Sequence, residues 1–150
     1  MFMKRDFSHR FGVILTEAGR LYGRRFDQLA RDHLTLTRAQ CRALVVLAGR
    51  PPEQAMTQAA LAEHLDVSAM AVATLCDRLE AAGLIRRQPR ADDRRVNQLL
   101  LEPSAHQAID AALALGDQVQ AEALAGFSDA ERDLLQALLK RIQANLGPLD

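Results

Sequence analysis

The chain has 150 residues, of which 49% are hydrophobic and 25% are charged, a composition that is normal for a soluble globular protein. It contains no run of about 18 apolar residues, which excludes a membrane span, and no apolar segment follows its basic N-terminal residues, which excludes a secretory signal, so we expect a cytoplasmic protein. The net charge is zero, but the charges are unevenly spread. Residues 1–37 carry seven Lys or Arg against four Asp or Glu, residues 38–100 carry nine against seven, and residues 101–150 carry three against eight. This asymmetry fits nucleic-acid binding by one part of the chain.

A long helix is expected over residues 7–33, where apolar residues recur at spacings of three and four. A second helix should begin after Thr37, because Gln40 lies three residues further on, which is the spacing of a capping box. This helix should end near Ala48, since Gly49 and a pair of prolines come soon after it.

Two shorter helices come next and have the spacing of a helix-turn-helix. The third helix should start at Thr57, and the fourth, capped by Ser68, should close at Gly83. The turn between them is short, and Asp66 within it is a residue that tolerates a left-handed backbone. In such a unit the second helix enters the major groove of DNA. The alternative is an ordinary pair of helices packed in a core.

The pattern then changes to two strand-like segments, "LIRRQP" at 84–89 and "RVNQLLLE" at 95–102, joined by "RADDR". Five arginines fall within residues 84–98, so the predicted hairpin is cationic. A helix-turn-helix followed by such a hairpin is the winged form of the motif, whose tip reaches the sugar-phosphate backbone and the minor groove. Asp92 and Asp93 would each hold an arginine in one rotamer through a charge-assisted pair. The alternative is a solvated charged turn.

Two more helices are expected in the last third of the chain. One should start at Pro103, a position where proline is tolerated, and run to about Gly126. The other should start at a capping box, "SDAE" at 128–131, and end at the Gly-Pro pair at 147–148. The terminal helices carry apolar residues on more than one face, which one chain of this size would leave exposed, so we expect a dimer.

Several strings in this chain are specific. They are "LAEHLDVS", "VATLCDRLEAAGLIRR", "DRR" followed by "VNQLLLE", and the link "RPPEQ". With these strings the chain resembles the MarR family of bacterial transcription regulators, and within it the SlyA-like branch, over about residues 8–146.

The resemblance implies a mainly α fold with a small β-hairpin wing. A winged helix-turn-helix lobe would occupy residues 37–102, and long N- and C-terminal helices over residues 1–36 and 103–150 would form the dimerisation region. Such homodimers bind a pseudo-palindromic duplex with half-sites about one helical turn, roughly 34 Å, apart. Small aromatic acids, phenolics or oxidants often release them from DNA. The Asp-x-Arg of the family's wing falls on Asp93 and Arg95.

The expected DNA-binding residues lie along the fourth helix and on the hairpin. They are Ser68, Ala69, Met70, Ala71, Ala73, Thr74, Arg78, Arg86, Arg90, Asp93, Arg94 and Arg95. Family members often carry an arginine near Ala73, and this chain has none. Direct readout would then rest on Ser68, Thr74 and apolar contacts with thymine methyl groups, and groove shape would add specificity.

An effector pocket would lie, by the same resemblance, between the first helix, the second helix and the winged lobe. The candidate residues are Arg20, Tyr22, Gln40 and Arg42, of which an arginine would pair with a carboxylate effector. The alternative for each residue is a role at an interface or on the surface.

Other site classes find no support in the sequence. Cys41 and Cys76 share faces with core residues, so we expect packing, with oxidant sensing as the alternative. The four histidines lack metal-ligand spacing, and no phosphate loop, nucleophile elbow or His-Cys cluster occurs. We therefore expect no enzymatic activity, no metal and no cofactor.

Taken together with this resemblance, the sequence predicts a sequence-specific DNA-binding transcription regulator that acts as a homodimeric repressor on a pseudo-palindromic operator. Its expected partners are double-stranded DNA, a second copy of the chain and a small aromatic or phenolic effector. The alternative is a winged-helix module for protein–protein contact without specific DNA binding; a salt-dependent, sequence-selective duplex affinity would separate the two.

Overall fold

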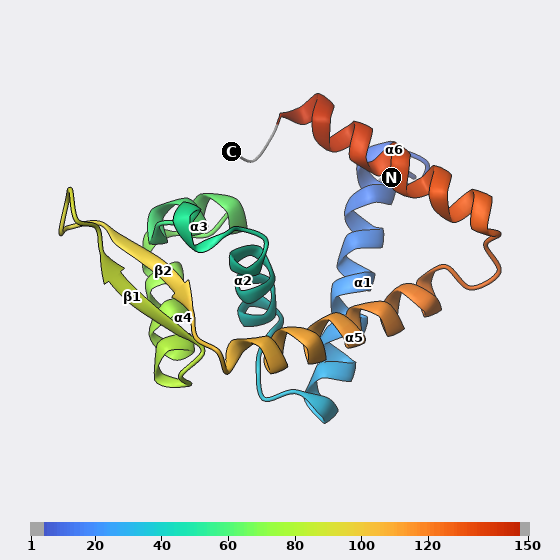
Figure 1. Ribbon diagram of the computed structural model, residues 1–150. Coiled ribbons are helices and arrows are strands. Elements are labelled where there is room, and N and C mark those ends of the chain that lie inside the picture. The colour runs from blue at the N-terminus through green and yellow to red at the C-terminus, as the bar shows by residue number, and fades with distance from the viewer. Residues whose placement is uncertain (1–4, 148–150) are drawn as a thin grey trace.

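The computed structural model describes residues 5–147 and is mainly helical over that range, with one antiparallel hairpin (Figure 1). In chain order the elements are α1 Phe11–His33, α2 Arg38–Ala48, the 3-10 turn η1 Pro52–Gln54, α3 Gln58–Leu65, α4 Ala69–Ala81, β1 Ile85–Pro89, β2 Asn97–Leu101, α5 Ala105–Ala123 and α6 Asp129–Leu146. This order confirms the predicted winged helix-turn-helix with long helices on either side.

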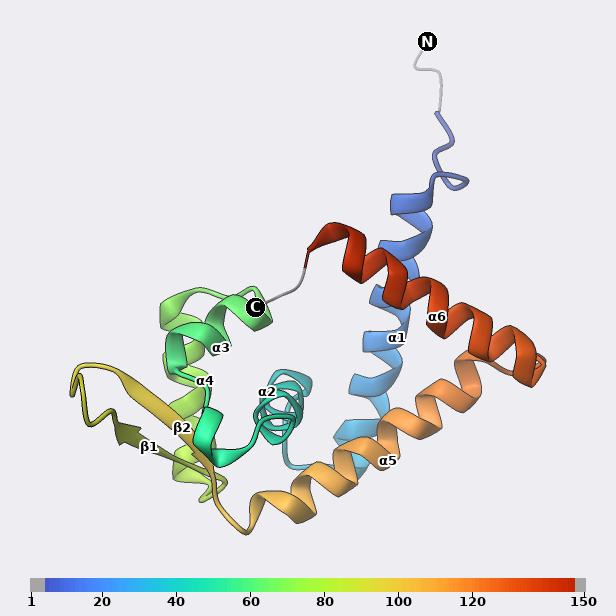
Figure 2. The ribbon, with the colours of Figure 1, turned by 45° about the horizontal axis from the view of Figure 1, so that its top comes forward.

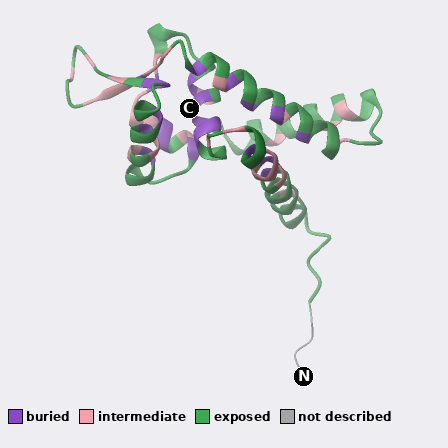
Figure 3. Cartoon of the chain, turned by 90° about the horizontal axis from the view of Figure 1, so that it is seen from below, coloured by how far each residue is buried: buried purple, intermediate pink, exposed green. Residues whose placement is uncertain are grey.

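The buried residues, purple in Figure 3, form two clusters that both draw on α2 and α5. The larger cluster fills the lobe made by α2, α3, α4, the hairpin and the start of α5. Its most deeply buried large side chains include Leu44, Leu61, Leu79 and Ile85. The smaller cluster joins α1, α2 and α5, with Phe26 and Leu115 among its members. Helix α5 therefore ties the winged lobe to α1.

The helix starts follow the capping residues that the sequence indicates. Thr37 Oγ1 accepts a hydrogen bond from the Gln40 backbone at 3.2 Å, and the Gln40 side chain accepts one from the Thr37 backbone at 2.8 Å, so the predicted capping box of α2 is confirmed. Ser128 and Glu131 form the same reciprocal pair at the start of α6. Ser68 caps α4 through its hydroxyl oxygen.

The turn between α3 and α4 has the geometry of a helix-turn-helix. The two helices are bent by 112° across the break, within the usual range for this motif. Asp66 ends α3 with φ 54° and ψ 50°, so the left-handed conformation expected there is confirmed. Gly83, which follows α4 with φ 72°, turns the chain into β1.

The hairpin is in register from its base to its tip. Ile85 pairs with Leu101 at the base, and Pro89 pairs with Asn97 nearest the tip. Leu99 also donates its backbone N–H to the Met56 carbonyl at 2.9 Å, which attaches β2 to the segment before α3. The wing is therefore held against the helix-turn-helix by backbone bonds on both sides of β2.

Several predicted boundaries were wrong. Helix α1 starts at Phe11 rather than at residue 7, because the Arg10 N–H is bonded to the Phe7 carbonyl in a turn. Helix α5 starts at Ala105 rather than at Pro103, because Pro103 lies in a turn closed by a bond from Ala105 N–H to the Glu102 carbonyl. It ends at Ala123, and Gly126 follows with φ 83° in the link to α6.

Details of the links also differ from expectation. The 3-10 turn η1 was not predicted. Gly147 follows α6 as expected, whereas Pro148, the other residue expected to end that helix, lies outside the described residues.

Helix α6 lies on the opposite side of the molecule from the hairpin (Figures 1 and 2). None of its residues is buried, although one side chain in three is Leu or Ile: Leu134, Leu135, Leu138, Leu139, Ile142 and Leu146. Leu134 is 59% exposed and Leu146 is 82% exposed. No single helix among residues 5–147 is long and apolar enough to cross a membrane, and only α3 and α4 taken together, across their bend, pass that length and composition test.

Candidate nucleic-acid interface

Helix α4 turns one face into the lobe and the other to solvent. Val72, Cys76 and Leu79 on the inner face are buried. On the opposite face Met70 is 81% exposed, and Thr74, one turn further on, is exposed as well. The first turns of this helix are therefore free to meet another molecule, as expected for a recognition helix.

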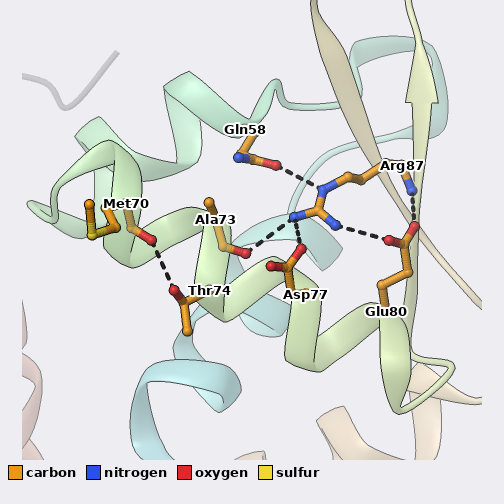
Figure 4. A network of polar contacts seen from close by, with 7 residues as sticks. All are labelled: Gln58, Met70, Ala73, Thr74, Asp77, Glu80 and Arg87. Atoms are coloured by element: carbon orange, nitrogen blue, oxygen red, sulfur yellow. Dashed lines mark hydrogen bonds and ion pairs between the residues drawn. The ribbon is translucent and has the colours of Figure 1, made fainter.

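The two hydroxyl side chains at the start of α4 are already engaged with its own backbone. Ser68 Oγ accepts the N–H of Ala71 at 3.1 Å. Thr74 Oγ1 donates to the carbonyl of Met70 at 3.1 Å (Figure 4). Between them lie three alanines, Met70 and the buried Val72, so the exposed start of α4 is mainly apolar.

The tip of the wing holds two arginine–aspartate pairs. Arg90 Nε lies 2.8 Å from Asp92 Oδ1, and Arg95 Nε lies 3.1 Å from Asp93 Oδ1. The hydrogen bond from Arg90 lowers the pKa of Asp92, and that from the Arg95 side chain lowers the pKa of Asp93. Both carboxylates therefore stay ionised at neutral pH, and the pairs expected from the sequence are present.

These pairs still leave positive charge at the tip. Arg95 is 91% exposed despite its contact with Asp93, and the neighbouring Arg94 is also exposed. Over residues 84–98 five arginines face two aspartates, and Arg94 and Arg95 stand at the end of the hairpin that projects furthest from the lobe (Figure 1). This arrangement suits a polyanion that passes beside the lobe.

Arg86 is placed differently from the other expected contacts. It lies at the base of the hairpin, where its backbone pairs with Leu100. Its Nε is 3.1 Å from Glu102 Oε1, and Nη1 is 3.2 Å from Gln88 Oε1. The fold thus separates Arg86 from the arginines at the tip.

Arg87 is a central residue of the lobe that sequence reasoning left out of the site. Its guanidinium contacts Asp77 at 2.7 Å, Glu80 at 2.9 Å, the Ala73 carbonyl at 3.2 Å and Gln58 Oε1 at 2.9 Å (Figure 4). Its backbone N–H also donates to Glu80 at 2.9 Å. One side chain of the wing therefore joins α3, α4 and β1.

The charges in this network reinforce one another. Partial burial works against the charged form of Arg87, but hydrogen bonds with Asp77 and Glu80 outweigh burial and raise its pKa. The backbone and side-chain bonds from Arg87 in turn lower the pKa of Glu80. Strand alternation was the available signal, because Arg87 shares a face of β1 with buried Ile85.

The two cysteines lie inside the core clusters. Cys76 has no exposed surface, and Cys41, on α2, is buried in the cluster that α2 forms with α1 and α5. Burial raises the pKa of both thiols, which disfavours the reactive thiolate. The packing role expected for them fits this environment.

A cleft of about 550 Å³ opens between α1, α2 and α5. Tyr22 and Arg42, two of the four expected effector residues, line it together with Phe26 and Arg38. The Tyr22 hydroxyl donates to the Gly116 carbonyl at 3.2 Å, which fixes the ring across the cleft. The arrangement combines aromatic rings with two cationic side chains.

The other two expected effector residues are occupied elsewhere. Arg20 lies on the exposed side of α1, where its Nη2 is 2.6 Å from Glu17. Gln40 is buried and uses its side chain in the cap of α2. It lines a smaller cavity of about 230 Å³ between α2 and the helix-turn-helix, and Arg42 borders this cavity as well as the larger cleft. Among residues 5–147, no three His, Cys, Asp or Glu side chains gather as a metal site requires.

Comparison with known proteins agrees with this architecture. Residues 34–96 match the family model described as MarR family. The crystal structure of the transcriptional regulator PA3341 shares 34% sequence identity with this chain at a TM-score of 0.74, and the match covers 91% of this chain and 97% of that one.

Two further structures match along nearly their whole length. BpsR of Bordetella bronchiseptica, whose DNA binding is regulated by 6-hydroxynicotinic acid, has 23% identity and a TM-score of 0.76, covering 94% of this chain and 98% of that one. Wild-type MarR from E. coli in its apo form has 22% identity and a TM-score of 0.77, covering 88% and 95% respectively. At these identities the likeness concerns the fold.

Proposed function

This chain belongs to the MarR family of transcription regulators, and on that basis we propose that it is a homodimeric repressor of the SlyA-like branch that binds a pseudo-palindromic operator. The observation that carries the proposal is the pairing of an exposed α4 with a hairpin whose tip presents Arg94 and Arg95. The "RPPEQ" link before α3 and the "DRR" string of the wing support the choice of branch.

In this proposal each part of the lobe contacts a different part of the duplex. The start of α4, from Ser68 to Thr74, enters the major groove, and Arg78 reaches a phosphate from the next turn. The tip residues Arg90, Asp93, Arg94 and Arg95 follow the backbone into the adjacent minor groove. Arg86, held by Glu102 at the base, contributes positive potential rather than a contact of its own.

The dimer in this proposal is formed by residues 1–36 and 103–150, and residues 37–102 form the DNA-binding lobe. Support comes from the apolar side chains that the single chain leaves exposed on α1, just before it, and on α6. They include Phe7, Phe11, Ile14, Leu21, Leu134, Leu138 and Leu146. Burying such a surface against a second copy removes it from water and sets two lobes on one duplex.

The cleft between α1, α2 and α5 is the proposed effector site. A small aromatic or phenolic acid would stack on Tyr22 or Phe26 while Arg38 or Arg42 meets its anionic group. The relative BpsR responds to 6-hydroxynicotinic acid, a small aromatic acid, which supports this class of ligand. Arg42 also borders the smaller cavity, whose lining includes Thr74 and Arg78 of α4, so a ligand in the cleft would alter the surroundings of the recognition helix.

The test is selection of bound sequences from a randomised duplex pool at near-physiological salt. We expect enrichment of an inverted repeat whose two halves are about 10 base pairs apart, centre to centre. A folded dimer that enriches no sequence would overturn the proposal and favour the alternative, a winged-helix module for protein–protein contact.

A further inference from the structure

The DNA-facing start of α4 lacks the side chains that read bases by paired hydrogen bonds. Among exposed positions from Ser68 to Thr74 there is no Arg, Lys, Asn, Gln, Asp or Glu. The largest exposed side chain in this segment is the thioether of Met70, which is 81% exposed. An unbranched, polarisable side chain of this kind adapts its shape to an apolar partner.

The hydroxyl groups on this face are also partly committed. The Thr74 hydroxyl donates its proton to the Met70 carbonyl, so it cannot donate to a base. The methyl group of Thr74 is then the main part of this side chain that can contact a base edge. The Ser68 oxygen is occupied by the Ala71 N–H. In the major groove the one apolar feature among the four base-pair edges is the C5-methyl group of thymine.

We propose that the first two turns of α4 form a methyl-reading surface, in which Met70 and Thr74 pack against C5-methyl groups of thymines in each operator half-site. This inference rests on the proposed DNA-binding function and specifies what the recognition helix reads. The polar readout that an arginine–guanine or glutamine–adenine pair supplies elsewhere is replaced here by burial of apolar surface.

The surroundings favour DNA rather than an apolar protein partner on this surface. Arg78 lies one turn beyond Thr74 on the same side of α4, and the wing tip brings Arg94 and Arg95. Asp77, which would repel phosphates from the middle of the helix, is neutralised by Arg87 at 2.7 Å. The apolar surface is therefore small and bordered by cations, as a groove between two phosphate backbones requires.

The experiment replaces single thymines of the selected operator by deoxyuridine, which removes only the C5-methyl group. We expect the affinity to fall about fourfold for each methyl group that α4 buries, and to stay unchanged at thymines outside its reach. Replacing a critical thymine–adenine pair by 5-methylcytosine–guanine should retain more affinity than replacing it by cytosine–guanine, because the methyl group is kept.

Matched variants of the protein assign the contacts. Thr74→Val keeps the methyl group and should preserve the deoxyuridine effect, whereas Thr74→Ser keeps the hydroxyl and should reduce it. Met70→Leu should preserve the effect, whereas Met70→Asn should lose it at one thymine per half-site. Circular dichroism and dimer mass establish that each variant is folded.

Two results would overturn the inference: tight operator binding that is indifferent to every deoxyuridine substitution, or an enriched repeat whose half-sites contain no thymine. Both differ from failure of the proposed function, in which no duplex sequence is enriched at all.

Discussion

Arg87 lies where it can shape the proposed DNA-binding surface without touching DNA. Its guanidinium meets Asp77 and Glu80 on α4 while its backbone belongs to β1. Without Arg87, the carboxylates of Asp77 and Glu80 would be unpaired on a helix that approaches phosphates. The residue thus has two effects, since it attaches the wing to α4 and removes negative charge from the interface.

Arg87→Ala should weaken operator binding on the order of tenfold and lower the free energy of unfolding by about 2 kcal/mol, because charged hydrogen bonds are lost and carboxylates are left unpaired. Adding Asp77→Asn to this variant should recover part of the affinity, since it removes one bare carboxylate. Fluorescence anisotropy with labelled operator and urea unfolding measure the two quantities. If Asp77→Asn gives no recovery, the electrostatic role assigned to Arg87 is incorrect.

Changing Arg94 and Arg95 together to Ala should weaken binding to all duplexes and leave the dimer intact. The slope of log affinity against log salt should shrink by roughly one for each phosphate contact removed. The matched control is Lys140 and Arg141 to Ala on α6, which removes the same charge from the opposite side of the molecule. Equal losses in both double variants would mean that net charge, rather than the wing, governs affinity.

The sequence predicted those residues whose partners are close in the chain. The cap of α2 depends on Thr37 and Gln40, three residues apart, and the wing pair of Arg95 depends on Asp93, two residues away. Arg87 could not be assigned in this way, because Gln58 lies 29 residues earlier and only the fold brings them together. Gln40, which the sequence suggested as an effector residue, uses its side chain in the cap of α2.

At the scale of elements, the angle between α3 and α4 depends on a single left-handed residue. Asp66 allows the chain to leave α3 and enter α4 within three residues, and Leu65 and Val72 on either side then pack into one core. Composition and periodicity predicted both helices and their order. They could not give the start of α5, because Pro103 is equally compatible with a first helical turn and with the turn that precedes it.

Substitutions at Asp66 should separate backbone strain from side-chain contacts. Asp66→Val should lower the free energy of unfolding by about 1–2 kcal/mol, since a β-branched residue strongly resists positive φ. Asp66→Gly should leave it unchanged or raise it slightly, because glycine adopts this conformation freely. Urea midpoints at constant m-value measure both changes. A valine variant as stable as the parent would show that the turn does not require a residue that tolerates positive φ.

At the scale of the whole molecule, the chain is divided between a well-packed lobe and terminal helices that are poorly covered. The lobe has buried residues on α2, α3, α4, β1 and β2, whereas α6 has none. The sequence indicated this division through apolar residues on several faces of the last helix. The apolar pattern could not indicate the cleft between α1, α2 and α5, because its lining comes from three distant segments; the expectation of a pocket beside the first two helices came from the family resemblance.

Leu138→Glu on α6 should shift the protein towards monomer, since a carboxylate placed in a buried apolar interface costs several kcal/mol. Operator affinity should fall with it, because two half-sites are then no longer held together. Sedimentation equilibrium measures the association state. Gln136→Glu, at an exposed polar position of the same helix, introduces the same charge and should leave the dimer intact. Dimers of unchanged stability in the Leu138 variant would exclude α6 from the interface.

The opposed placement of the wing and α6 also has a kinetic consequence. Arginines gather at the hairpin, while the acidic residues of the last third of the chain lie largely on α5 and α6. The excess of three positive charges in residues 1–37 offsets part of that negative charge, so the chain carries a modest electric dipole between the hairpin and α6. In the field of a polyanion this dipole exerts a torque that turns the hairpin forward before contact. A chain of zero net charge can therefore meet DNA with its hairpin already facing the duplex. Its association rate constant can be high without the non-specific binding to polyanions that is typical of a basic protein.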